Sequence, residues 1–357
     1  MRNFFPLFLS CLLVLSGCTG EQPKAKPQDY ESEFPVESFI RTHLLAENGL
    51  LRTNVTNRHN EFLSESIGLY LLFLVERNRE QEFADQIVVL TDYFLDESNL
   101  LSWRVEKKNE ELITSPVNAW IDDARIVHAL YLAAKSFDEP TYIELANNIS
   151  ESLSTIAIKD GLPVDYVDLK TKESSDVITL SYLDEAALKL MPNSSNLYSN
   201  SKNLLVEAPT DGPFFAKAYS IKDQAYTFDD EINMIDQLYV ALRYEQFSLS
   251  TDRFYTFFKE AFETGPVYGR YDRSNGTPTV TYESQAVYAL AVFYLLERGE
   301  DELAEMVMKR LRDLAVQDES SDYYGGFIDV STQHTHSFDN LLPLLAEGRL
   351  LGGYIVP

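Results

Sequence analysis

The chain has very little cysteine, which limits its chemistry. Of 357 residues only Cys11 and Cys18 are cysteines, and both lie near the N-terminus. The rest of the chain therefore has no disulfide, no thiolate nucleophile and no cysteine ligand for a metal. Its stability must come from a hydrophobic core. A 45% apolar composition over a chain of this length is enough to build one large domain.

Positive charge is also scarce. Lys and Arg number 30 against 56 Asp and Glu, so the formal net charge is −26. Bulk electrostatics therefore disfavours nucleic acid and anionic surfaces as partners. A neutral or cationic polymer is the easier partner.

No histidine cluster or nucleotide-binding motif in the sequence indicates a cofactor site. His334-Thr335-His336 has no third ligand at metal-site spacing. No glycine-rich phosphate loop and no Ser-His-Asp order stands out. We expect no metal and no cofactor.

The N-terminus has the pattern of an export signal. Arg2 precedes the apolar run from Phe4 to Leu15, and small residues lead to Cys18. The pattern predicts a lipoprotein signal peptide over residues 1–17, a lipid on Cys18 and a flexible tether over 18–34. Residues 35–357 would form the domain, on the extracellular face of the cell membrane. An ordinary signal peptide or an uncleaved anchor is the alternative.

Helix follows helix after residue 35. Apolar residues recur at three- and four-residue spacing in segments 65–76, 83–94, 121–137, 142–156, 180–190, 232–244, 254–262, 287–296, 303–314 and 338–345. Six similar turn-like stretches, beginning near residues 48, 99, 160, 211, 264 and 324, separate the helices at intervals of about 50 to 60 residues. A period of that size is typical of stacked helix pairs. We predict an all-α (α/α)6 toroid, with six inner and six outer helices, short turns or hairpins at its mouth, and a monomeric state.

Carboxylates stand where several inner helices would begin. They are Glu65, Asp122 with Asp123, Asp229 with Asp230, and Glu283; the Glu-Ser context of Glu65 recurs at Glu283. Acidic residues also cap helices and favour the helix dipole, which is the structural alternative for each of them. In a closed ring these side chains would share one mouth, as acid-catalysed cleavage of a sugar chain requires.

The Glu65 segment resembles glycoside hydrolase family 8, whose general acid lies in a Ser-Glu-Gly-x-Gly stretch. Ser64, Glu65 and Gly68 match that stretch, and Ser66 replaces its first Gly. A second family signature, Ala-Ser/Thr-Asp-Ala/Gly-Asp-x-x-Ile-Ala-x-Ala-Leu followed by a spaced Ala and Phe, is matched in register at Ala119, Asp123, Ile126, Ala129, Leu130, Ala133 and Phe137.

Three positions of that second signature depart from the family. Trp120 takes the Ser/Thr place, Ile121 replaces the first Asp, and Asp122 stands one position later. The family's Asp-Ala-Ile-Arg-Val segment, which carries the base, is echoed from Asp230 to Met234. Overall the chain is similar to the glycosidase lipoproteins that accompany exopolysaccharide synthesis in Gram-positive bacteria.

The resemblance implies roles for these carboxylates. Glu65 would be the general acid and Asp230 the general base of an inverting, endo-acting hydrolase, with Asp229 in reserve. Asp123, with Asp122, would hold hydroxyls of the distorted sugar.

Aromatic side chains would stack on sugar rings along the cleft. Trp103 and Trp120 are the candidates near the mouth, and Tyr226 would position the attacking water. Burial in the core is the alternative for any one aromatic residue of the chain.

The function predicted is hydrolysis of a secreted or cell-wall-associated polysaccharide. Ile121 at a signature Asp position favours a different class, a non-catalytic polysaccharide-binding or assembly lipoprotein on the same fold. A third alternative, a toroid of other chemistry such as a lyase, fits poorly with an acidic cleft.

Overall fold

The computed structural model describes residues 30–109 and 111–352. The predicted signal peptide, Cys18 and the tether up to residue 29 lie outside these residues. The helices are α1 (Pro35–Phe39), α2 (Ser64–Glu76), α3 (Glu80–Tyr93), α4 (Trp120–Ser136), α5 (Thr141–Ile156), α6 (Glu185–Leu190), α7 (Ser195–Glu207), α8 (Met234–Gln246), α9 (Asp252–Thr264), α10 (Gln285–Arg298), α11 (Asp301–Asp313) and α12 (Phe338–Gly352), with a π-helical turn η1 (Ile40–Leu44) and a 3₁₀ turn η2 (Leu180–Tyr182).

Burial separates an inner set of helices from an outer set. In α2 every residue from Ser66 to Val75 is buried, and in α10 every residue from Ala286 to Leu295. Helices that are apolar all round must be enclosed by others. By contrast α9 buries only Phe254 and Phe258, so it covers the core from outside.

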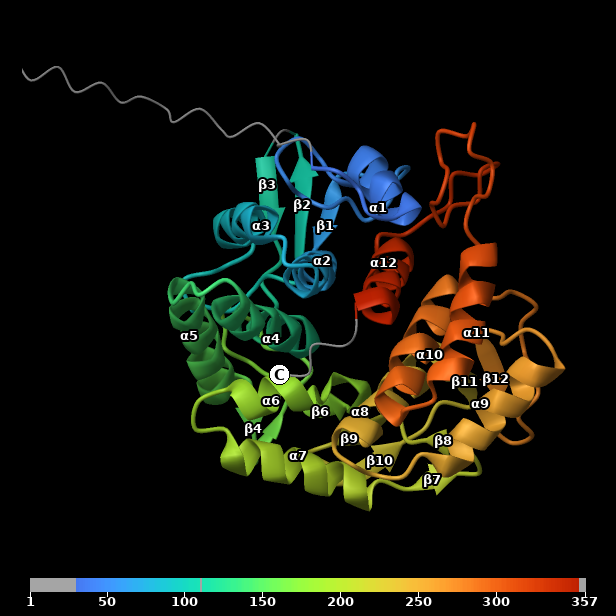
Figure 1. The fold of residues 1–357 in the computed structure, drawn as a ribbon. Coiled ribbons are helices and arrows are strands. Elements are labelled where there is room, and N and C mark those ends of the chain that lie inside the picture. The colour runs from blue at the N-terminus through green and yellow to red at the C-terminus, as the bar shows by residue number, and fades with distance from the viewer. Residues whose placement is uncertain (1–29, 110, 353–357) are drawn as a thin grey trace, which may run out of the picture.

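The enclosed helices form a ring (Figure 1). Helix α2 packs on α4, α4 on α6, α6 on α8, α8 on α10 and α10 on α12, and α12 returns to α2. Helices α1, α3, α5, α7 and α11 pack on members of this ring. Phe254 of α9 contacts Tyr294 of α10 edge to face. The chain is thus a mostly helical toroid of paired helices.

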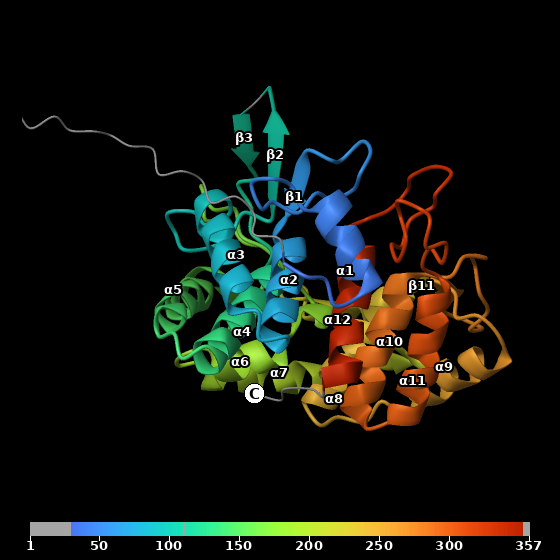
Figure 2. The ribbon, with the colours of Figure 1, turned by 45° about the horizontal axis from the view of Figure 1, so that its top comes forward.

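Short strands connect the helices, so the chain is not purely helical. They are β1 (Glu61–Leu63), β2 (Arg104–Lys108), β3 (Glu111–Thr114), β4 (Ile158–Lys159), β5 (Leu162–Pro163), β6 (Val177–Thr179), β7 (Thr210–Asp211), β8 (Phe214–Phe215), β9 (Ala218–Ser220), β10 (Ala225–Thr227), β11 (Glu231–Asn233) and β12 (Arg270–Asp272). They pair antiparallel in the orders β1-β2-β3, β10-β9-β6, β11-β12, β4-β5 and β7-β8. Strand β1 runs directly into α2 (Figure 2). Strand β11 likewise ends at Asn233, immediately before α8.

Among the described helices, none combines the length and the apolarity that a membrane crossing requires.

Candidate active site

The end of the ring at which α2, α4, α8, α10 and α12 begin is called the mouth. Ser64 opens α2, and its hydroxyl donates to Oδ2 of Asp122 at 2.6 Å. Gly68 lets α4 approach closely, because a Cβ there would lie 3.2 Å from Cγ1 of Ile126. The first turns of α2 and α4 therefore bring Glu65 and Asp122 together.

Glu65 is poised to hold a proton. Burial, and then the charge of Asp122, raise its pKa to about 8, and Asp339 adds to the effect. Arg125 and Arg58 act in the opposite direction without cancelling it. Glu65 is half-buried, so part of the residue remains exposed. A protonated and accessible carboxyl can serve as a general acid at neutral pH.

Asp122 is tied to a buried cation. Nη1 of Arg125 lies 3.0 Å from Oδ1 of Asp122, and the two side chains are 6% and 7% exposed. Burial raises the pKa of Asp122, while Arg125 and the Ser64 hydroxyl lower it. This pair places fixed opposite charges beside Glu65.

Two further groups at this site were missed from the sequence. Burial, and the charges of Asp165, Asp122, Asp236 and Glu65, raise the pKa of the Tyr182 hydroxyl, which therefore lies within electrostatic range of all four.

Asp236 lies in the first turn of α8 with its side chain 26% exposed. Burial raises its pKa, and Lys217, whose Nζ is 3.9 Å away, lowers it. The sequence prediction began this helix at Ile232, two residues too early, and so did not place Asp236 in the first turn.

Asp229 and Asp230 do not open a helix. They precede β11, and α8 begins only at Met234. The Asp230 side chain is 97% exposed and pairs with Arg273 at 3.0 Å, whereas Asp229 receives a hydrogen bond from Lys217 at 2.7 Å. Asp230 is thus an exposed residue paired with Arg273, and its role as the base stays a prediction.

Asp123 is enclosed by its own neighbours, which corrects its predicted role. It is fully buried, and its oxygens accept from the Leu101 N–H at 3.2 Å and from Nδ2 of Asn118 at 2.6 Å. Burial raises its pKa well above the usual value. Asp123 thus anchors two loops, and only Asp122 of the pair lies beside Glu65.

The three aromatic residues predicted to line the cleft differ in their burial and orientation. Trp120 is fully buried and offers no ring face to a sugar, which corrects that expectation. The Tyr226 hydroxyl donates to the Leu204 carbonyl at 2.6 Å, so it points toward α7 and not at a catalytic water. Trp103 is half-buried, and its carbonyl accepts the Ser64 N–H at 3.0 Å, which places it next to the start of α2.

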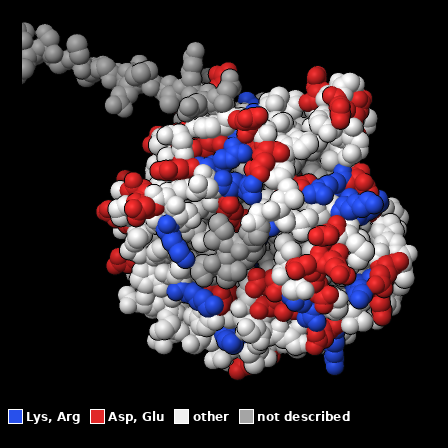
Figure 3. All heavy atoms as spheres, viewed as in Figure 1, with Lys and Arg blue, Asp and Glu red and all other residues white. Residues whose placement is uncertain are grey.

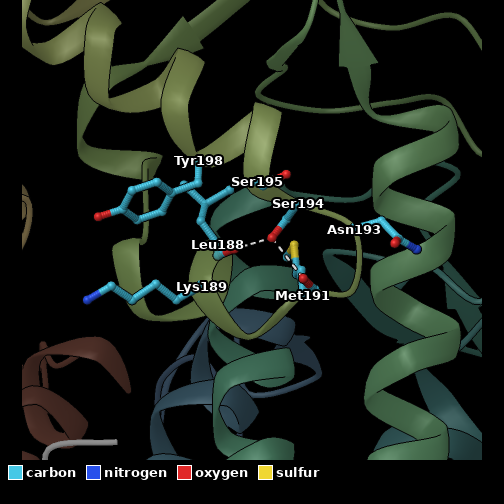
Figure 4. Close-up of a pocket in the computed structure, with 7 residues that line it drawn as sticks. All are labelled: Leu188, Lys189, Met191, Asn193, Ser194, Ser195 and Tyr198. Atoms are coloured by element: carbon cyan, nitrogen blue, oxygen red, sulfur yellow. Dashed lines mark hydrogen bonds between the residues drawn. The ribbon is translucent and has the colours of Figure 1, made fainter.

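Other features of the described residues do not compete with the mouth. No group of three or more His, Cys, Asp or Glu in the part of the chain that the structure describes is arranged to hold a metal. An open hollow of about 430 Å³ lies at the junction of α6 and α7 (Figure 4). Its lining includes Leu188, Met191 and Tyr198, and none of the predicted site residues.

Comparison with known proteins gives relatives over nearly the whole chain. No protein-family profile matches it. It is 36% identical over 328 residues to the "Putative lipoprotein YdaJ" of Bacillus subtilis, covering 90% of this chain and 88% of that one.

Solved structures share the fold. A novel alpha-amylase from Clostridium perfringens superposes with a TM-score of 0.81 at 27% identity, over 88% of this chain and 96% of that one. PssZ from Listeria monocytogenes gives 0.74 at 26%, over 91% and 98%. The endo-beta-1,4-glucanase CMCax from Acetobacter xylinum gives 0.64 at 18%, over 88% and 96%, and so supports the fold alone.

Proposed function

The chain belongs to the family of YdaJ, a divergent branch of the glycoside hydrolase family 8-like proteins, and from this we propose that it is a polysaccharide hydrolase. Its ring is interpreted as an (α/α)6 toroid with the mouth as the substrate cleft. The observation that carries the proposal is Glu65: a carboxyl whose pKa is raised to about 8, at an accessible mouth, beside a fixed Asp122–Arg125 pair.

The reaction proposed is hydrolysis with inversion. Glu65 donates its proton to the glycosidic oxygen as the bond from that oxygen to the anomeric carbon breaks. A second carboxylate takes a proton from a water, whose oxygen bonds to the anomeric carbon from the opposite face of the sugar. The two carboxyls must then stand ~6.5–9.5 Å apart to admit that water.

We assign the base to Asp236 in place of Asp230. Asp236 shares the neighbourhood of Tyr182 with Glu65, and Lys217 helps to keep it ionised. Tyr182 can hold the attacking water between them, the role first given to Tyr226. Trp103 and Asp122 would contact the sugar.

The substrate proposed is a secreted or cell-wall-associated polysaccharide, such as an exopolysaccharide, cleaved internally. The names of the structural relatives include an alpha-amylase and an endo-beta-1,4-glucanase, so the test panel contains α- and β-linked glucans, together with xylan, chitosan and purified exopolysaccharide. New reducing ends are measured for the wild type, Glu65→Gln, Asp236→Asn and Asp230→Asn.

We expect Glu65→Gln and Asp236→Asn each to lower the rate by about 10²–10⁴-fold, and Asp230→Asn to leave it nearly unchanged. Full activity in Glu65→Gln would remove Glu65 as the acid. Loss in Asp230→Asn with retention in Asp236→Asn would return the base to Asp230. A wild type that binds a glycan and cuts none would favour the non-catalytic binding lipoprotein.

We place the protein on the outer face of the cell membrane, held by a lipid on Cys18. The name of YdaJ supports a lipoprotein. The full-length chain expressed in a Gram-positive host should partition into the detergent phase of a Triton X-114 extract, and Cys18→Ala should move it to the aqueous phase. Equal partition of both forms would contradict the anchor.

A further inference from the structure

Asp339 lies beside Glu65 on the neighbouring inner helix. Helix α12 packs on α2, and the hydroxyls of Ser66 and Ser337 are hydrogen-bonded at 2.8 Å. The Ser337 N–H also donates to the Thr53 carbonyl at 2.8 Å, which fixes the residue just before α12. The first turns of α2 and α12 are thereby held side by side at the mouth.

Asp339 differs from Asp122 in that no ion pair to its carboxyl is found among the residues that the structure describes. Its side chain receives a hydrogen bond from Gln285 of α10, and the exposed His334 acts to lower its pKa. Burial raises the pKa of Asp339 to about 6 despite these two groups. Asp122, by contrast, is paired with Arg125 at 3.0 Å.

The charged and titratable groups facing Glu65 come from every side of the mouth. Asp122 and Asp339 raise its pKa, whereas Arg125 and Arg58 lower it. The hydroxyls of Tyr182 and Tyr239 are also close enough for the charge of Glu65 to raise their pKa values. Burial and Asp122 have the larger effects on the Glu65 pKa, and Asp339 adds a second negative charge from the neighbouring helix.

We propose that Asp339 is a positioning residue, whose carboxylate across the α2–α12 contact helps to keep the Glu65 carboxyl protonated at neutral pH. The inference rests on the proposed function, since it assumes that Glu65 is the acid. Between about pH 6 and pH 8 Asp339 is ionised while Glu65 still carries its proton. Removing the charge of Asp339 favours the ionised form of Glu65 and so lowers the Glu65 pKa.

The test follows Glu65 directly as well as through activity. The full-length chain, purified in mild detergent, is labelled with ¹³C at the Glu side-chain carboxyl, and the signal missing from Glu65→Gln identifies Glu65. Its titration is compared in the wild type, Asp339→Asn, Asp339→Glu and Asp322→Asn. Asp322→Asn removes the same charge from an exposed position in the loop before α12. The pH profile of kcat/KM is recorded for each protein.

In Asp339→Asn we expect the Glu65 titration and the alkaline limb of the profile to move down by roughly one pH unit. Asp339→Glu should largely restore both, and Asp322→Asn should change neither. If Asp339→Asn does not fold, Asp339→Ser is used in its place, because serine keeps an oxygen at the helix start without the charge.

An unchanged Glu65 titration in a folded Asp339→Asn or Asp339→Ser protein overturns the inference. A lower Tm with an unchanged titration does so too, because it shows Asp339 to be only a helix-start residue. A shifted titration in a protein that cleaves no glycan supports the inference and counts against the proposed hydrolase.

Discussion

Two glutamates in the same Glu-Ser context, Glu65 and Glu283, have opposite electrostatics. Burial raises the pKa of Glu283, but hydrogen bonds from Arg310 and Tyr288 outweigh it and leave that pKa below its usual value. Glu65 forms no ion pair within the described part of the chain, and its pKa rises to about 8. The sequence motif therefore marks a repeated position in the ring, whereas partners from distant segments decide which glutamate can donate a proton.

Asp123 illustrates how the motif predicted the place of a residue but not its role. The family signature located the start of α4 correctly, yet the roles of Asp122 and Asp123 depend on which faces the Ser64 hydroxyl and which faces the Leu101 N–H. That choice depends on β1 and on the loop after α3, which are distant in sequence. The sequence around Asp122 and Asp123 therefore could not show which of the two lies beside Glu65.

For Asp123→Ala we expect a loss of stability. The change leaves the buried Leu101 N–H and Asn118 amide without an acceptor, which costs about 1–3 kcal/mol of the free energy of unfolding. Urea denaturation measures it, and Asp313→Ala at an exposed position of α11 is the control for charge. Unchanged stability with abolished cleavage would instead give Asp123 the sugar-binding role that the motif suggested.

At the scale of helices, periodicity predicted the long inner helices well because they are continuous apolar stretches. It missed α7 (Ser195–Glu207), which is rich in Asn and Ser and carries few apolar positions. It also predicted that α8 begins at Ile232, two residues too early. The prediction was wrong there because pairing of β11 with β12 holds residues 231–233 extended. Such pairing joins segments far apart in the chain and leaves no local signal.

Closure of the ring far from the mouth depends on an ion pair between its first and last inner helices. Arg349 of α12 holds both oxygens of Glu76 of α2 at 2.8–3.1 Å, and the side chains are only 7% and 12% exposed. The Arg349 guanidinium also lies over the ring of Phe293. This pair should therefore contribute more to stability than a surface pair.

Arg349→Met should lower the free energy of unfolding by about 3 kcal/mol, because it leaves Glu76 buried and unpaired. The double variant with Glu76→Gln should recover part of the loss. Chemical denaturation compares these variants with Lys159→Met, which breaks a pair to Asp176 in which both side chains are 41% exposed and should cost less than about 1 kcal/mol. Equal losses for the two pairs would show that ring closure does not depend on Arg349.

On the scale of the whole molecule, negative charge dominates the surface as well as the mouth. On the face seen in Figure 3, acidic side chains gather over the region of α8 to α11, with Lys and Arg among them. With a net charge of −26 the molecule attracts cationic polymers over a distance set by ionic strength. At the mouth, Asp122 and Asp339 act on Glu65, and Asp236 adds a further carboxyl 3.9 Å from Lys217.

This excess of carboxyls predicts a preference for a polysaccharide carrying free amines. For a matched pair of glycans, partly deacetylated and fully acetylated, we expect kcat/KM to be about tenfold higher for the deacetylated form at low salt. Between 0.01 and 0.15 M salt the Debye length falls from about 30 to about 8 Å, so the advantage should shrink, while cleavage of a neutral glucan stays nearly constant. Equal turnover of both forms at low salt would show that the carboxyls at the mouth influence each other's protonation but do not select the substrate by charge. A preference that ignores salt would place the selecting contact inside the cleft, where Asp122 and Asp339 are shielded from the solvent.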